Sequence, residues 1–447
     1  MGWRRLYRST AFQIFVVGLC AFSAPGIWNA MNGLGVGGSQ TPDLVNAANA
    51  LLFGFMTVTC FLGPFLTNLV GFKITLALGS IGYPLYAAGL YCNNRFGTTW
   101  LVYVGSVACG ITAGIFWSVE GAVVTGYPEA HKRGRAVATW CTFKYFGNIV
   151  GGAISLALNI HMNQQGQVSY STYQAFIAIQ CLGLVFGLLL SNPEKVIRSD
   201  GTKIEAPKVP FKQQAKSMWR LLTSRPILML APLFWYFGWT AAYPGTYLAT
   251  YFSVRSRSLA SFLNAVVSSL ASWLAGSIVD IKWTKKRRTR AIVAFAVMAA
   301  MNTGTWIWAV IIQNEFRKTH PKLDWADQKT FGRGFGYYVF ERAAVGMIEN
   351  YIYWCIGNLS DSPGDQVLYS SLLRGIETAA NAISYGVQAA PTALIITAGL
   401  NMGFWFLALP FSIFATLLVV RKFDELERAR KIADVEDDGS EALEEKI

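Results

Sequence analysis

The 447-residue chain is 53% hydrophobic, 14% aromatic and only 14% charged, which lies well outside the averages of soluble globular domains. These values indicate a polytopic membrane protein. The net charge of +13 does not indicate nucleic-acid binding, because the basic residues lie between apolar runs and not on one amphipathic face.

Twelve apolar runs are each long enough to cross a bilayer as a helix. The first follows Arg4, Arg5 and Arg8 as a signal peptide would, but its length and the run directly after it predict a retained helix. The expected fold class is therefore an all-α polytopic membrane protein with 12 transmembrane helices. They are expected at residues 10–32, 44–69, 73–92, 98–126, 136–159, 171–191, 226–251, 258–280, 290–313, 334–358, 367–390 and 394–420.

A polar, Lys- and Arg-rich stretch between the sixth and seventh runs divides the chain. We expect an N-terminal six-helix half at 1–191, a basic cytoplasmic central loop at 192–221, a C-terminal six-helix half at 222–420 and an acidic cytoplasmic tail at 421–447. With both termini in the cytoplasm, most of the 38 Lys and Arg residues fall on cytoplasmic segments, as the positive-inside rule requires. The basic loop 314–333 would lie on the outer side and is the exception to this rule. The membrane could be the plasma membrane or an internal one.

The fourth and fifth runs carry the first candidate site residues. Glu120 follows Trp117 by three residues, so the indole and the carboxylate share a helix face. A carboxylate inside hydrocarbon suits proton coupling or contact with a cation, whereas a structural Glu120 would pair permanently with Lys144 or cap a turn. Lys144 itself could pair or extend toward the interface.

The second half contributes two further charged sets. Glu349 lies deep in the tenth run and is the second candidate for a functional carboxylate. Arg374 and Glu377 in the eleventh run are three residues apart, so they are expected to meet on one helix face and neutralise each other.

Aromatic residues gather in the seventh run, where Pro244-Gly245 is expected to interrupt the helix. An aromatic cavity lining is predicted there. The alternative is an interface belt with a tolerated kink. The aromatic residues are Trp235, Tyr236, Trp239, Tyr243 and Tyr247.

The sequence contains no Walker-type phosphate loop, no metal-ligand spacing and no GxSxG elbow. We therefore expect no enzyme activity, no cofactor and no bound metal. The expected partners are the lipid bilayer, an unidentified small solute and another membrane protein, with no nucleic acid.

Several stretches resemble the major facilitator superfamily, especially fungal members of its Unc-93-like branch. The resemblance is carried by residues 22–38, 68–90, 110–138 and 251–266. Its most specific part combines Trp117-x-x-Glu120-Gly121 with Tyr127-Pro128 and Gly134-Arg135. Such proteins commonly have Gln where this chain has Glu120. The loop Gly71-Phe72-Lys73 is shorter and less charged than the facilitator signature at that place, so the gating salt bridge of that signature is not expected.

This resemblance implies a 6+6 pseudo-symmetric bundle, and two functions are compatible with it. The first is a secondary transporter that moves a small solute by alternating access, with the proton as a candidate coupling ion. An acidic, aromatic-lined cavity would favour an organic cation or an amphipathic metabolite. The second is a non-transporting regulator or trafficking partner of a membrane channel or receptor.

Overall fold

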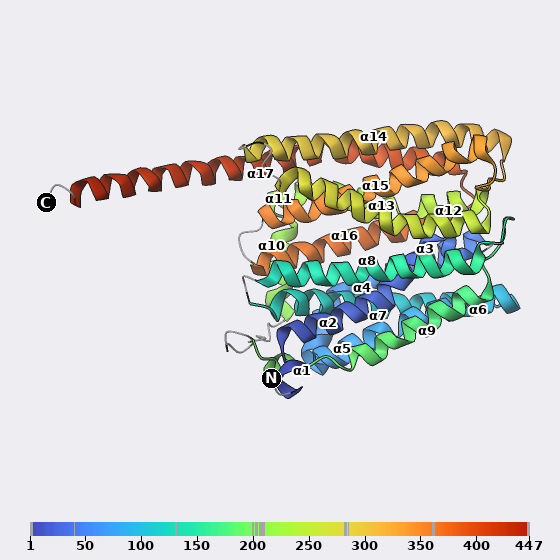
Figure 1. The fold of residues 1–447 in the computed structure, drawn as a ribbon, viewed down its shortest axis with the longest axis horizontal. Helices are drawn as coiled ribbons and strands as arrows, with labels where there is room; N and C mark the ends of the chain where they lie inside the picture. Colours follow the sequence, from blue (N-terminus) through green and yellow to red (C-terminus); the bar gives the residue numbers. More distant parts are fainter. Residues whose placement is uncertain are drawn as a thin grey trace.

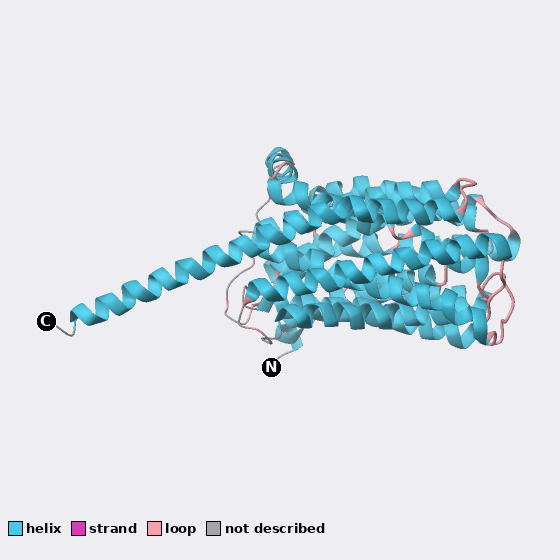
Figure 2. Ribbon diagram, turned by 90° about the horizontal axis from the view of Figure 1, so that it is seen from above, coloured by secondary structure: helices cyan, strands magenta, loops and turns pink. Residues whose placement is uncertain are grey.

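The computed structural model describes residues 3–39, 41–129, 132–198, 201, 204, 211–280, 284, 286–359 and 363–444. These residues form an elongated bundle of long helices (Figure 1). Both termini lie at one end of the bundle, which we call the terminal end, and the opposite end is called the far end (Figures 1 and 2).

The first six predicted spans all coincide with helices. The first span is interrupted at Pro25, which lies in a short π-helix because proline supplies no backbone N–H to the regular ladder. In chain order the elements are α1 (Trp3–Tyr7), α2 (Thr10–Ala21), η1 (Phe22–Gly26), α3 (Ile27–Gly33), η2 (Val36–Gly38), α4 (Pro42–Val70), α5 (Phe72–Ser80), α6 (Gly82–Phe96), α7 (Trp100–Gly126), α8 (Arg133–Asn159), α9 (Tyr170–Gly187) and η4 (Pro193–Lys195).

The last six predicted spans also coincide with helices. These are α11 (Arg225–Trp239) with α12 (Ala242–Tyr251), α13 (Val254–Asp280), α14 (Arg287–Thr319), α15 (Gln328–Leu359), α16 (Pro363–Ala389) and α17 (Leu394–Glu444). By length and composition alone, six of the helices in the described residues could each cross a membrane. The other predicted spans are broken helices or carry more polar residues. The chain is therefore an all-α polytopic membrane protein with 12 transmembrane segments.

The break in the seventh span does not lie where the sequence predicts it. The helix is interrupted at Thr240 and Ala241, and Pro244 lies in the first turn of α12. A first-turn proline costs little because the N–H it lacks would have no partner inside the helix. The prediction of a broken helix is confirmed, but the predicted position is wrong by a few residues.

The predicted central loop contains a helix of its own, α10 (Phe211–Leu222), at the terminal end. Residues 199–200, 202–203 and 205–210 of this loop lie outside the described residues. Arg198 donates to the carbonyl oxygens of Gly126 and Tyr127 over 2.8 and 2.9 Å, where it caps the last turn of α7. The predicted tail continues α17 as a helix to Glu444, which projects away from the bundle (Figure 1).

Two clusters of buried apolar side chains fill the bundle, one mostly from the first six spans and one from the last six. The two groups of spans meet where α4 packs along α16 and α8 packs along α13. Gly110 and Gly147 each begin a Gly-xxx-Gly repeat, a spacing that permits close helix packing, and they lie against the carbonyl groups of Leu52 and Phe22. A larger side chain at either position would collide with backbone, so these contacts hold helices of the first group of spans close together.

Candidate functional site

A cavity of about 270 Å³ lies at the centre of the bundle, between the two groups of spans. Its lining comes from α3, α4, α7 and α8 on one side and from α11, α12, α13, α15 and α16 on the other. Central cavities between two six-helix halves are where secondary transporters of this architecture bind their substrates. This cavity is therefore the candidate site.

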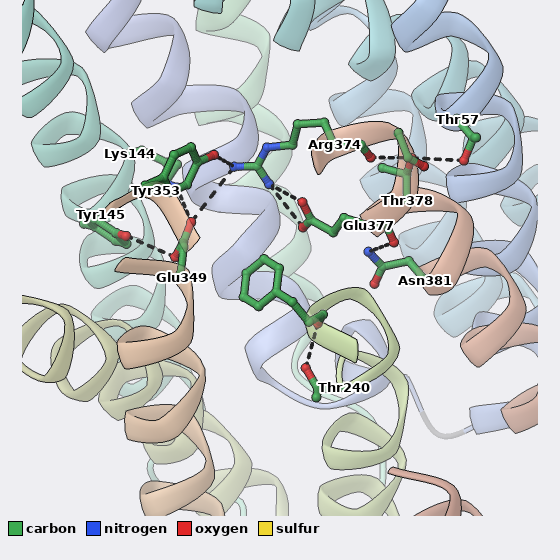
Figure 3. Close-up of polar contacts among 12 residues, drawn as sticks. Thr57, Lys144, Tyr145, Thr240, Glu349, Tyr353, Arg374, Glu377, Thr378 and Asn381 are labelled. Carbon is green, nitrogen blue, oxygen red and sulfur yellow. Dashed lines mark hydrogen bonds and ion pairs between the residues drawn. The ribbon is translucent and has the colours of Figure 1, made fainter. Parts of the chain in front are cut away.

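A chain of alternating charges crosses the cavity wall and joins the two groups of spans. The ammonium group of Lys144 on α8 lies 3.5 Å from Oε1 of Glu349 on α15. The same oxygen lies 4.0 Å from Nη2 of Arg374 on α16, whose Nη1 donates to Oε2 of Glu377 over 2.8 Å (Figure 3). Tyr145 donates its hydroxyl to Glu349 over 3.2 Å. Glu349 is thus a carboxylate held between two cations.

The indole of Trp117 covers part of this cluster. The guanidinium carbon of Arg374 lies 4.7 Å from the Trp117 ring centroid, and the Lys144 ammonium lies 5.8 Å from it. Both distances are within the range of cation–π attraction. Trp117 therefore helps to hold two cations in a region of low dielectric constant.

The charges that line the cavity are balanced, so the cavity is not acidic. Lys144 and Arg374 face Glu349 and Glu377, while Arg342, which also lines the cavity, is paired with its buried neighbour Glu341. The expectation of an acidic cavity that selects an organic cation is therefore not supported by this arrangement.

Glu120 lies outside the cavity lining. It is fully buried, and neither of its carboxylate oxygens has a hydrogen-bond partner among the described residues. Three residues turn a helix by about 300°, so Trp117 can face the cavity while Glu120 points about 60° away into the packing of α7. The pairing of Glu120 with Lys144 considered from the sequence is not formed, because Lys144 pairs with Glu349.

The aromatic residues predicted in the seventh span also lie outside the cavity lining. The Tyr236 hydroxyl donates to Asn302 over 3.0 Å and the Tyr243 hydroxyl to Gln313 over 2.9 Å, both on α14. The ring of Trp239 packs against Phe404 on α17, with 4.4 Å between centroids. These side chains form the aromatic core of the second group of spans because α11 and α12 turn them toward α14 and α17.

The sequence reasoning missed two kinds of lining residue. One is Arg342, a charged residue near the end of the tenth run that reaches the cavity. Amides from several helices also line the cavity. The signal that could have revealed them is a polar residue inside an apolar run. They are Asn29, Asn32, Asn46, Asn49, Asn148, Asn264 and Asn381.

Arg257 lies outside the cavity lining, at the far end of the bundle, where it holds the two groups of spans together and so keeps them closed there. Its side chain is 1% exposed and comes from the first turns of α13. It donates to the carbonyl oxygens of Leu34, Gly35 and Ser39 over 2.7, 2.8 and 3.2 Å, and to that of Gly166 over 2.7 Å. All four acceptors belong to the other group of spans, so one side chain ties together three segments across the interface.

A second polar cluster supports this closure, and its carboxylate, Asp324, lies in the loop between α14 and α15. Arg255 Nε donates to Oδ1 of Asp324 over 2.8 Å, and its guanidinium lies over the Trp325 ring. These charge-assisted bonds, with help from Ser253, hold the pKa of the Asp324 carboxyl well below its usual range.

We expect Asp324→Asn to lower the stability of the purified protein by about 1–3 kcal/mol near neutral pH, because Arg255 loses its charged acceptor. The stabilisation is fully present above the unfolded-state pKa of about 3.9 and is lost as the pH falls through the lower folded-state pKa. The difference in melting temperature between wild type and variant should therefore be constant above about pH 5 and shrink in more acidic buffer. Equal melting temperatures at pH 7 would contradict this role for Asp324.

Comparison with known proteins identifies the family. The profile described as "Ion channel regulatory protein UNC-93" matches residues 46–315, more than half of the chain. The chain belongs to the UNC-93 family. The chain is 38% identical to "Notoamide biosynthesis cluster protein O'" of Aspergillus versicolor, over 90% of this chain and 87% of that one. It is 29% identical to "UNC93-like protein 1" of Arabidopsis thaliana, over 86% and 85%.

Solved structures similar to this UNC-93 family member are transporters of the major facilitator type. A D-xylose-proton symporter superposes with a TM-score of 0.59 at 14% identity, covering 92% of this chain and 96% of that one. A POT family transporter in complex with 5-aminolevulinic acid superposes with a TM-score of 0.63 at 13% identity, covering 90% and 96%. At these identities the likeness shows the fold alone. The fold is thus the 6+6 pseudo-symmetric bundle.

Proposed function

We propose that this UNC-93 family member is a secondary transporter that moves a small solute by alternating access. The observation that carries the proposal is the central cavity, which both groups of spans line while Arg257 holds them closed at the far end of the bundle. Segments 1–191 and 222–420 would be the two halves that rock about it. The names of the two similar structures and of the Aspergillus relative support a small molecule as the solute.

We place the terminal end of the bundle in the cytoplasm. Most Lys and Arg residues outside the spans lie on segments at this end, including the central loop and the start of α14. In this orientation Arg257 and Asp324 lie on the outer side of the membrane, and the structure is closed toward the outside.

Glu349 is the residue that we propose for proton coupling. It lies on α15 and contacts Lys144 of the other half and Arg374 of its own half, so its charge state affects contacts on both sides of the cavity. Protonation would remove the negative charge that holds the two cations together. Packed helices with two stable arrangements can convert such a local loss of charge into a movement of one half relative to the other.

Uptake into liposomes tests this function. Purified protein is reconstituted, and a panel of neutral, cationic, anionic and zwitterionic small solutes is offered with and without an inward proton gradient. We expect saturable uptake of one class, accelerated by the gradient. Absence of uptake across the whole panel would contradict transport.

The second candidate is a non-transporting regulator of a membrane channel or receptor, which the family description favours. The same preparation distinguishes the two. A membrane protein that co-purifies in stoichiometric amount, together with absence of uptake, would support the regulator and overturn the transporter.

A further inference from the structure

Aromatic rings line the part of the cavity next to α3 and α4. Trp28 on α3 meets Phe53 on α4 edge to face, with 5.8 Å between centroids. Phe53 stacks on Tyr385 of α16, with 5.6 Å between centroids and 7° between planes. These three rings come from both halves and give a planar ligand group apolar faces to pack against.

Four buried polar atoms around the cavity lack a hydrogen-bond partner among the described residues. They are Nε1 of Trp28, Nδ2 of Asn49, Oδ1 of Asn148 and Oδ1 of Asn381. The set contains two donors and two acceptors. A buried polar group without a partner is costly, so a bound molecule that supplies partners to these atoms would be stabilised by them.

In two of the amides one polar atom of the side chain already has a hydrogen bond within the protein. The other polar atom is left for a ligand. Asn49 is 1% exposed and accepts a hydrogen bond from the Tyr86 hydroxyl over 2.7 Å, so its NH2 group is left over. Asn381 is 4% exposed and donates to the carbonyl oxygen of Glu377 over 3.0 Å, so its Oδ1 is left over. Anchored amides of this kind give a binding site directional hydrogen bonds at little entropic cost.

The charges around the cavity do not favour a charged ligand. Glu349 and Glu377 already have Lys144 and Arg374 as partners, and Arg342 already has Glu341. An ion of either sign would add an unbalanced charge to this already neutral set, which is expensive in a region of low dielectric constant.

From these observations we infer that the cavity binds a neutral molecule with a small ring system and a group, such as an amide, that both accepts and donates hydrogen bonds. The ring lies against Trp28 and Phe53, and the amide pairs with donors of Trp28 or Asn49 and with an acceptor of Asn148 or Asn381. The cavity, at about 270 Å³, is near the small end of the range for ligand pockets, which fits a ligand with one or two rings. The cellular role of such a ligand rests on the proposed function, whereas the inference itself concerns only whether the cavity binds it.

Thermal unfolding of the purified full chain in detergent tests the inference. Four compounds share one phenyl ring and differ in charge: 2-phenylacetamide is neutral, 2-phenylethylamine cationic, phenylacetate anionic and phenylalanine zwitterionic. We expect 2-phenylacetamide to raise the melting temperature at concentrations where the other three do not. A charged member that stabilises as well as the amide, or no stabilisation by the amide, would overturn the inference.

Variants locate the site. Trp28→Phe keeps a ring but removes the N–H, and Asn49→Leu removes the free amide; each should weaken 2-phenylacetamide binding about tenfold, the upper range for one neutral hydrogen bond. Trp273→Phe is the matched control, because Trp273 is 72% exposed on α13 and lies outside the cavity. Unchanged affinity in both cavity variants would overturn the site.

Different results would contradict the binding inference and the transport proposal. Stabilisation by 2-phenylacetamide without uptake of any solute would contradict transport and leave this inference standing. Uptake of a charged solute that 2-phenylacetamide does not inhibit would contradict the inference and leave transport standing.

Discussion

Glu349→Gln is expected to abolish proton-driven uptake and to destabilise the protein, although the amide has nearly the same shape as the carboxylate. The variant leaves Lys144 and Arg374 buried with only Glu377 to balance two positive charges. Removing one partner of a buried ion pair costs about 3–5 kcal/mol. Liposome uptake and the melting temperature of the purified protein measure the two effects.

Two further variants test whether the effects come from the lost charge of Glu349 or from any change to a buried carboxylate. Glu120→Gln alters a carboxylate that is fully buried, whereas the Glu349 side chain is 19% exposed, and Glu120 lies outside the cavity lining with no ion-pair partner among the described residues. Uptake and melting temperature should therefore stay close to wild type. Lys144→Gln combined with Glu349→Gln removes one charge of each sign and should recover most of the lost stability. It should not recover the dependence of uptake on a proton gradient.

Two outcomes would contradict these expectations for Glu349 and Glu120. Proton-driven uptake by Glu349→Gln at the wild-type rate would show that Glu349 does not couple protons to transport. Loss of uptake in Glu120→Gln with normal stability would instead return Glu120 to the coupling mechanism that its position in an apolar run first suggested.

The helices of this protein could be predicted because the membrane leaves few options for the backbone. Every apolar run of sufficient length is helical, since no other open-chain structure satisfies its peptide groups in lipid. The position of the break near Pro244 could not be predicted, because a proline is compatible both with a kink and with the first turn of a new helix. Only packing decides between these.

Part of the site could be predicted from the sequence. The rest depends on contacts between distant parts of the chain, which no local pattern reveals. The pair of Arg374 and Glu377 follows from their spacing along one helix, and the structure confirms their contact at 2.8 Å. The partner of Lys144 does not follow from any local rule, because Glu349 lies in the other half of the chain. Likewise, hydropathy marks Tyr236 as buried without saying whether it faces a cavity or the neighbouring helix α14.

The closure at the far end depends on Arg257, and this dependence leads to a second large effect. A buried arginine normally requires a carboxylate, but the hydrogen-bond partners of this one among the described residues are backbone carbonyl groups. Gly35, one of the acceptors, has φ +73° and its Cα is so close to Gly245 that a Cβ would lie 2.7 Å from that carbonyl oxygen. Glycine is the residue that permits both this conformation and this approach. Such a contact forms only while the halves are together at the far end, so it stabilises one conformation and not the other.

We expect Arg257→Ala to shift the protein toward a conformation that is open at the far end. Three buried carbonyl groups and the half-buried one of Gly166 lose their donor, at about 1–3 kcal/mol for each buried group left without a partner, while opening exposes them to water. Cys109 lines the cavity and is 1% exposed, so its rate of labelling reports the opening. In a background in which the other six cysteines are replaced, an impermeant maleimide added to the far-end side should label Cys109 at least about tenfold faster in the variant.

Two substitutions make this result specific. Arg257→Lys keeps the charge, but one ammonium group cannot span three segments, so it should label at an intermediate rate. Arg333→Ala removes an exposed arginine, 57% accessible and paired with Glu315, and should label as slowly as wild type because exposed ion pairs contribute about 0–1 kcal/mol. Equal labelling rates in wild type and Arg257→Ala would mean that the remaining contacts, such as the 3.0 Å bond from Asn46 to Thr246, close the far end without Arg257.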